Sequence, residues 1–198
     1  SDNPRDGRRA SDAEGIYDLR FCKDGQWVSV RVDDHFPCRP GPDGGPVFSQ
    51  ANGPELWVLL VEKAYAKLHG SYYALRSGVC HEGLVDLTGA PTLHRLVHDE
   101  EEPLDFTDLL RYDRDDSLVC CSTPGQDDLT LNRPPSPKDG GRGGLVPGHA
   151  YTVISARQIR SGKHNGARLL KLRNPWGNFE WGGRFSDNSD EMRDQEAN

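Results

Sequence analysis

Two β-rich runs with a short turn between them form the first clear pattern in the chain. Apolar and polar residues alternate over 16–22 and again over 27–34, which is the period of a strand with one buried face. The residues between the runs, 23–26, contain the Asp-Gly pair that favours a tight hairpin turn. The pattern therefore predicts a small antiparallel unit.

Helical spacing is strongest over 54–70, where apolar residues recur every three or four positions. Pro54 suits the first turn of this helix and Gly70 suits its end. Three shorter elements are predicted after it: a strand or turn over 83–92, a helix over 103–113 capped near Asp105, and a buried strand over 117–123.

Pro, Gly, Asp, Lys and Arg dominate residues 124–147, a composition that buries little apolar surface and predicts a mobile surface insertion. Beyond it, 149–159 and 167–174 again alternate at strand period, and the turn-rich segment 160–166 joins them. We expect these two strands to pair antiparallel.

That pairing would place His149, at the start of one strand, beside Asn174, at the end of the other. An amide oxygen that accepts one ring N–H fixes the imidazole tautomer and leaves the other ring nitrogen for a nucleophile. Trp176 could shield this hydrogen bond from water. The alternative is that His149 is an ordinary residue at a strand end and Asn174 a turn residue before Pro175.

Composition and charge exclude several classes of protein. The 198 residues suffice for one large domain or two small ones. A net charge of −7 argues against a nucleic-acid-binding face, and the acidic runs at 99–102 and 113–116 are expected to be solvated loops. The sequence has no apolar run of the ~20 residues that span a bilayer and no leader segment, so neither a membrane span nor export is expected.

Five cysteines at irregular spacing predict neither a disulfide framework nor a paired zinc site, and they favour a reducing, cytoplasmic setting. The chain begins with Ser1 rather than Met, so we expect it to be cut from a longer protein with flanking domains.

Four parts of the sequence, in order, resemble segments of the calpain family of papain-like cysteine proteases. The clearest are GHAYTVI and LLKLRNPWGNFEWGGRFSDNS, which resemble the segments that hold the family's catalytic histidine and asparagine. The others are ELWVLLVEKAYAKLHGSYYAL with EGLVDLTGAPT, and GIYDLRFCKDGQWVSVRVDDHFPC. The Leu-Thr-Gly-Ala-Pro string suggests the small-optic-lobes branch.

The resemblance implies an α+β, papain-like protease core. Residues 1–14 would be a flexible segment, 15–82 a remnant of the helical first half, and 83–198 the β-rich second half, with a boundary near 77–89.

It also implies roles for individual residues. His149 matches the family's catalytic histidine, Asn174 its catalytic asparagine and Trp176 the tryptophan that shields the site. Gly89 and Gly148 match glycines at the border of the substrate cleft, where a missing side chain lets an extended peptide approach the backbone. The expected partners are therefore protein substrates in extended conformation.

Family members bind calcium within the core, and three carboxylates fall on matching positions. Glu55 matches a ligand of the first half, and Glu180 and Asp187 match ligands of the second. Calcium takes six to eight oxygen ligands, so neither site is complete with these carboxylates alone. The resemblance implies that the remaining first-half ligands lie before Ser1 and the remaining second-half ligands in a loop after Asp187. The alternative is that they are exposed without a metal.

The family nucleophile lies in a Gln-Gly-x-x-x-Asp-Cys-Trp string, with the cysteine at the start of a helix whose N-terminus lowers the thiol pKa. The 198 residues contain no such string, and no cysteine is followed by Trp or is predicted to open a helix. We therefore expect the nucleophile to lie upstream of Ser1 and this chain alone to lack peptidase activity.

Three hypotheses follow. The first is a calcium-dependent cysteine endopeptidase with a Cys-His-Asn triad, and the second is a non-catalytic calpain-like module that binds partners. The third, a metal module built on Cys80, His81 and His94, lacks the usual ligand spacing.

Overall fold

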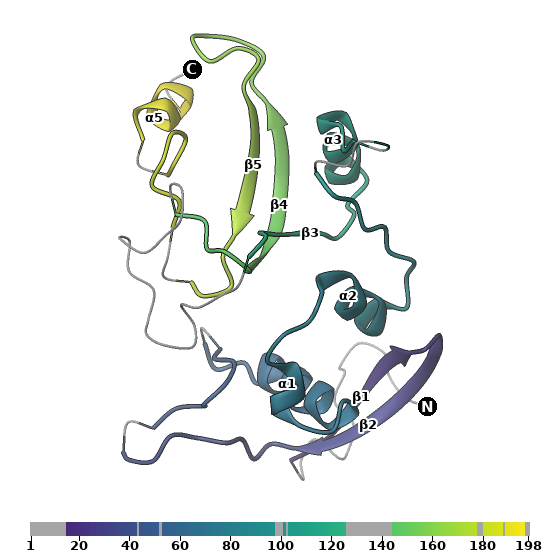
Figure 1. The fold of residues 1–198 in the computed structure, drawn as a ribbon. Coiled ribbons are helices and arrows are strands. Elements are labelled where there is room, and N and C mark those ends of the chain that lie inside the picture. Colours follow the sequence, from purple (N-terminus) through teal and green to yellow (C-terminus); the bar gives the residue numbers. More distant parts are fainter. Residues whose placement is uncertain are drawn as a thin grey trace, which may run out of the picture. The chain divides into compact units, whose positions relative to one another are not determined.

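The structure is a computed structural model that describes residues 15–42, 44–51, 53–97, 101, 103–125, 144–177, 180–187 and 189–196. These residues form helices and antiparallel sheets, so the α+β class is confirmed (Figure 1). The chain divides into two compact units, Ser1–His94 and Arg95–Asn198. The division into two protease halves at 82/83, which the resemblance implies, stays a prediction. The predicted flexible segment 1–14 lies outside the described residues.

A two-stranded hairpin opens the first unit, as predicted. Strand β1 (Ile16–Lys23) pairs antiparallel with β2 (Gln26–Asp33), and Lys23 lies opposite Gln26. The two residues between them, Asp24 and Gly25, both have positive φ, at 50° and 76°. This is the backbone of a type I′ turn, whose twist matches that of the flanking strands.

Helix α1 (Trp57–Leu68) packs against this hairpin and forms the core of the unit. Gly70, with φ of 94°, follows the end of the helix as predicted, whereas Pro54 lies ahead of the helix and not in its first turn. A short 3₁₀ helix, η2 (Tyr72–Leu75), follows. The buried apolar residues of the core are Phe21, Val30, Val32, Leu60 and Ala64.

The prediction of a strand or turn over 83–92 is wrong, because helix α2 covers Cys80–Thr88. Gly89 ends it in the left-handed conformation, with φ of 68°, and donates its N–H to the carbonyl of Val85. A short run such as Leu-Val-Asp-Leu-Thr does not distinguish a strand from a helix by its own periodicity. The decisive contact comes from elsewhere in the unit.

That contact is made by Asp86, which is only 5% exposed. Its carboxylate accepts a hydrogen bond of 2.8 Å from the Tyr65 hydroxyl and lies 3.2 Å from Lys23 Nζ. Burial alone would raise the pKa of Asp86, but the hydrogen bonds from Tyr65 and Lys23 outweigh it, and the pKa is lowered. A buried carboxylate needs such partners, so one residue joins α2 to α1 and β1.

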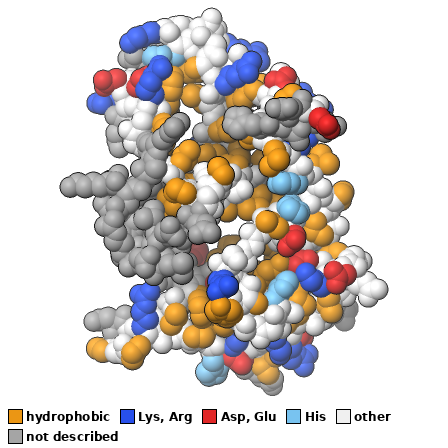
Figure 2. Space-filling view, in the orientation of Figure 1, with side chains coloured by type: hydrophobic (Ala, Val, Ile, Leu, Met, Phe, Trp, Pro, Cys, Tyr) orange, Lys and Arg blue, Asp and Glu red, His pale blue; other side chains and the backbone are white. Residues whose placement is uncertain are grey.

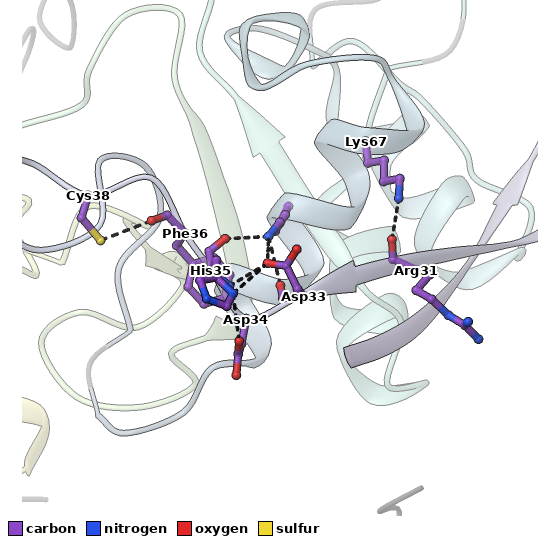
Figure 3. A network of polar contacts seen from close by, with 8 residues as sticks. Arg31, Asp33, Asp34, His35, Phe36, Cys38 and Lys67 are labelled. Carbon is purple, nitrogen blue, oxygen red and sulfur yellow. Dashed lines mark hydrogen bonds and ion pairs between the residues drawn. The ribbon is translucent and has the colours of Figure 1, made fainter. Parts of the chain in front are cut away.

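Two lysines of α1 fasten the helix to the end of β2. Lys63 Nζ lies 2.6 Å from Asp33 Oδ1 and donates to the carbonyl oxygens of Asp33 and His35. Lys67 Nζ donates to the carbonyl of Arg31 at 2.8 Å, as Figure 3 shows. The hydrogen bond from Lys63, together with one from the N–H of His35, lowers the pKa of Asp33 to about 2.

The second unit contains a three-stranded antiparallel sheet in the order β3 (Val119–Ser122), β4 (Ala150–Gln158), β5 (Arg168–Arg173). The predicted pairing of the two later strands is confirmed, with a register shift between Val153 and Ser155. β3 is a strand as predicted, but its residues are only half-buried, so the expectation of a buried strand is wrong.

Helix α3 (Phe106–Arg114) packs against β4, and Asp105 caps it as predicted by accepting from the N–H of Thr107. Helix α5 (Asp190–Glu196) is the last element. Figure 2 shows hydrophobic side chains spread over the face in view. Exposed apolar residues occur in both units, among them Trp57, Tyr73 and Leu118. Within the described ranges, no helix is long and apolar enough to cross a membrane.

Replacing Gly89 by alanine should destabilise the first unit more than replacing Gly70. Both glycines follow a helix at positive φ, which costs a non-glycine residue about 1 kcal/mol. A Cβ on Gly89 would also lie 2.8 Å from Cζ2 of Trp27, whereas a Cβ on Gly70 meets nothing within 4 Å. Urea unfolding should therefore show a free-energy loss about 1 kcal/mol larger for Gly89→Ala. Equal losses would contradict the packing described here.

Replacing Lys63 by methionine should raise the pKa of Asp33 from about 2 towards the ordinary value near ~3.9. Because the folded-state pKa is the lower one, this ion pair stabilises the fold above about pH 4, and its contribution is lost as the pH falls towards 2. A carbon-13 NMR titration of the Asp33 carboxyl measures the shift. Lys67→Met is the matched control, because Lys67 donates to a backbone carbonyl and should leave Asp33 unchanged.

Candidate active site

His149 lies immediately before β4, and its position is set by β3 as well as by its own strand. The N–H of Thr123 donates to the carbonyl of His149 at 3.0 Å, which extends the β3–β4 pairing by one residue. The side chain is almost fully buried, at 8% exposure for the residue. A buried imidazole needs a hydrogen-bond partner.

Asn174 is that partner. It follows the last residue of β5, and the distance between His149 Nε2 and Asn174 Oδ1 is 3.0 Å. The strand pairing thus brings the two residues together as the sequence predicted.

A second contact identifies the amide atom that faces the histidine. The backbone N–H of Trp176 donates to the same Asn174 Oδ1 at 3.1 Å. A backbone N–H can only donate, so the atom that both groups contact must be the amide oxygen. This contact requires a donor at Nε2, so a neutral imidazole here has its lone pair on Nδ1, where a proton acceptor needs it.

Two aromatic rings enclose the imidazole. The Trp176 ring centroid lies 4.3 Å from that of His149, and the Tyr151 ring meets it edge-on at 4.9 Å. Apolar rings beside the Nε2–H···Oδ1 bond keep water from competing for it and strengthen it. The position of the Trp176 ring is compatible with the predicted shielding, which stays a prediction.

The C-terminal end of the segment 124–147, predicted to be a mobile insertion, contains a buried residue. Val146 is fully buried, and its N–H donates to the Tyr151 hydroxyl at 2.9 Å. Residues 126–143 lie outside the described part of the chain. The composition did not predict that Val146 is buried, because a single apolar residue hardly changes the mean hydropathy of a polar segment.

The two glycines assigned to the cleft border both have a backbone reason to be glycine. Gly148 has φ of 62° in the turn before His149, and Gly89 ends α2 in the left-handed region. Residues that carry a side chain rarely adopt these backbone conformations. Their role at a substrate cleft stays a prediction.

The three candidate calcium ligands do not form a site within the described residues. Glu55 belongs to the first unit, and Glu180 and Asp187 belong to the second. No group of three or more His, Cys, Asp or Glu side chains that could hold a metal occurs in the described part of the chain. Calcium takes six to eight oxygen ligands, so the described carboxylates do not by themselves supply a complete site, and the assignment of Glu55, Glu180 and Asp187 stays a prediction.

The same finding counts against a metal module at Cys80, His81 and His94. The rings of the two histidines lie 5.0 Å apart, but the described residues supply no three-ligand group around them. None of the five cysteines forms a disulfide bond in the structure. Cys80 is the first residue of α2, which contradicts the expectation that no cysteine opens a helix.

Comparisons with known proteins agree with this geometry. A family model described as calpain family cysteine protease matches residues 4–197. The chain is 39% identical over 190 residues to the calpain-type cysteine protease DEK1 of Arabidopsis thaliana. This alignment covers 92% of the chain and 8% of the Arabidopsis protein. It is 39% identical over 179 residues to human calpain-14 and 35% identical over 188 residues to the human calpain-2 catalytic subunit. Each of these alignments covers 88% of the chain, but only 24% and 23% of the human proteins. The chain thus spans a small part of the relatives it matches.

Replacing Trp176 by alanine should expose the bond between His149 and Asn174 to water. The backbone N–H of residue 176 stays in place, so the substitution removes the shielding ring and keeps the hydrogen bond. We expect exchange of the Nε2 proton with water, measured by NMR line broadening, to be at least ~10-fold faster. Trp181→Ala is the control, since its indole donates to the Arg184 carbonyl instead. Unchanged exchange in the Trp176 variant would contradict the shielding.

Proposed function

Because the chain belongs to the calpain family of cysteine proteases, we propose that it supplies the general base and the orienting amide of a cysteine endopeptidase. The observation that carries the proposal is the buried His149–Asn174 pair, in which Asn174 Oδ1 accepts a hydrogen bond from Nε2–H and leaves Nδ1 as the proton acceptor. The nucleophilic cysteine is proposed to lie in a segment that precedes Ser1.

The reaction is proposed to be acyl transfer from a peptide to water. His149 Nδ1 takes the proton of the thiol, and the thiolate attacks the peptide carbonyl carbon. The imidazolium then gives that proton to the leaving amine, and the acyl group remains on sulfur. Water hydrolyses the thioester while His149 again accepts and returns a proton. Asn174 holds the ring orientation throughout, because its oxygen accepts from Nε2–H in both protonation states.

The proposed substrates are proteins in extended conformation, cut at a limited number of sites. Gly148, directly before His149, has no side chain that would obstruct a peptide backbone. We also propose an intracellular location and flanking domains for the whole protein. Calcium dependence is proposed from the family alone, and no step above uses the metal, because Glu55, Glu180 and Asp187 do not form a site here.

The alternative is a calpain-like module without catalysis, which binds partners or regulates another protease. The 198 residues contain no Asp-Cys-Trp string that could supply the nucleophile, so they fit this alternative as well as the proposed protease. The segment that precedes Ser1 in the natural protein decides between the two proposals.

The test uses a protein extended through its natural preceding segment and an unstructured protein substrate, with and without calcium. We expect cleavage, and we expect His149→Ala to lower kcat by at least ~10³-fold, because the general base is lost. The 198-residue chain alone should not cleave the substrate.

His35→Ala is the control for the loss of a histidine, because the His35 side chain is 90% exposed and belongs to the other unit. A folded, extended protein that does not cleave would favour the non-catalytic module. Cleavage that survives His149→Ala would refute the assignment of the base.

A further inference from the structure

The turn that leads into His149 is open, and a side chain from another strand completes it. Residues 146–149 read Val-Pro-Gly-His, with proline and a positive-φ glycine at the two central positions. These are the residues that a type II turn prefers, and such a turn commonly closes through a bond from the fourth N–H to the first carbonyl. Here the His149 N–H goes instead to the Thr123 hydroxyl, at 3.0 Å.

The same hydroxyl donates its proton to the carbonyl oxygen of Val146. Thr123 Oγ1 therefore lies between the two backbone groups that would otherwise bond to each other across the turn. The inserted oxygen accepts from His149 and donates to Val146, so both buried groups are satisfied. The His149 carbonyl, 3.3 Å away, is a second acceptor within reach of the hydroxyl.

A second hydroxyl bonds to the same turn, through the N–H of Val146 instead of its carbonyl. The N–H of Val146 donates to Tyr151 Oη, and the ring of Tyr151 meets the imidazole edge-on. Val146 is fully buried between these two hydroxyls. The backbone before His149 is thus held by Thr123, directly after β3, and by Tyr151 in β4.

We propose that Thr123 is a positioning residue for His149: its hydroxyl holds the 146–149 turn open and so sets where the imidazole meets Asn174. This proposal rests on the proposed function of His149 as a general base. Without the hydroxyl, the turn can close directly from the His149 N–H to the Val146 carbonyl, which moves the histidine backbone. Displacing a catalytic group by about 1 Å costs on the order of 10²-fold in rate.

The variants are Thr123→Val, which keeps the shape but removes the hydroxyl, and Thr123→Ser, which keeps the hydroxyl but removes the methyl group. Ser122→Ala is the matched control, because Ser122 is exposed and directly precedes Thr123, as the last residue of β3. In the 198-residue chain, NMR of nitrogen-15-labelled histidine reports the Nε2–H of His149. We expect this signal to shift or broaden in Thr123→Val and to stay unchanged in Thr123→Ser and Ser122→Ala.

In the extended protein, we expect Thr123→Val to lower kcat about 10- to 100-fold with little change in KM, and Thr123→Ser to restore most of it. A folded Thr123→Val chain with the unaltered His149 signal would overturn the proposal. If Thr123→Val does not fold, Thr123→Ser is the test. An altered His149 signal in Thr123→Ser would overturn the proposal, because it would show that the methyl group of Thr123, and not its hydroxyl, positions the imidazole. Absence of cleavage by the extended protein would count against the proposed function alone, since the NMR measurement needs no activity.

Discussion

Antiparallel pairing between β4 and β5 is the constraint on which the candidate site depends. It brings together His149 and Asn174, which lie 25 positions apart in the sequence, and leaves 3.0 Å between their polar atoms. Loop contacts alone could not hold two side chains at this distance with the same accuracy as paired strands. The Trp176 N–H then fixes the amide, and the amide fixes the tautomer of the histidine.

Features that depend on neighbouring residues could be predicted from the sequence. The Asp-Gly turn, the helix α1 and the strand pair around 160–166 each follow from local spacing and turn chemistry, and the position of the His149–Asn174 pair follows from that strand pair. The resemblance to calpains agrees with the family match, and the plant relatives fit the branch that the motifs suggested.

Features that depend on distant partners could not be predicted. α2 is a helix in which Asp86 finds Tyr65 and Lys23, and those residues lie in two other elements. Val146 is buried because hydroxyls from β3 and β4 satisfy its backbone, although the surrounding composition is that of a solvated loop. Thr123 belongs to no motif, and its importance appears only when the partners of the His149 N–H are traced.

The tautomer of His149 tests the central claim most directly, because the proposed chemistry requires Nδ1 to be the proton acceptor. Two-dimensional NMR of the nitrogen-15-labelled chain, at a pH where the imidazole is neutral, distinguishes a protonated ring nitrogen from one with a lone pair. The account predicts a proton on Nε2 and a lone pair on Nδ1. A proton on Nδ1 would contradict it, since the histidine could then neither donate to Asn174 nor accept a proton from a thiol through Nδ1.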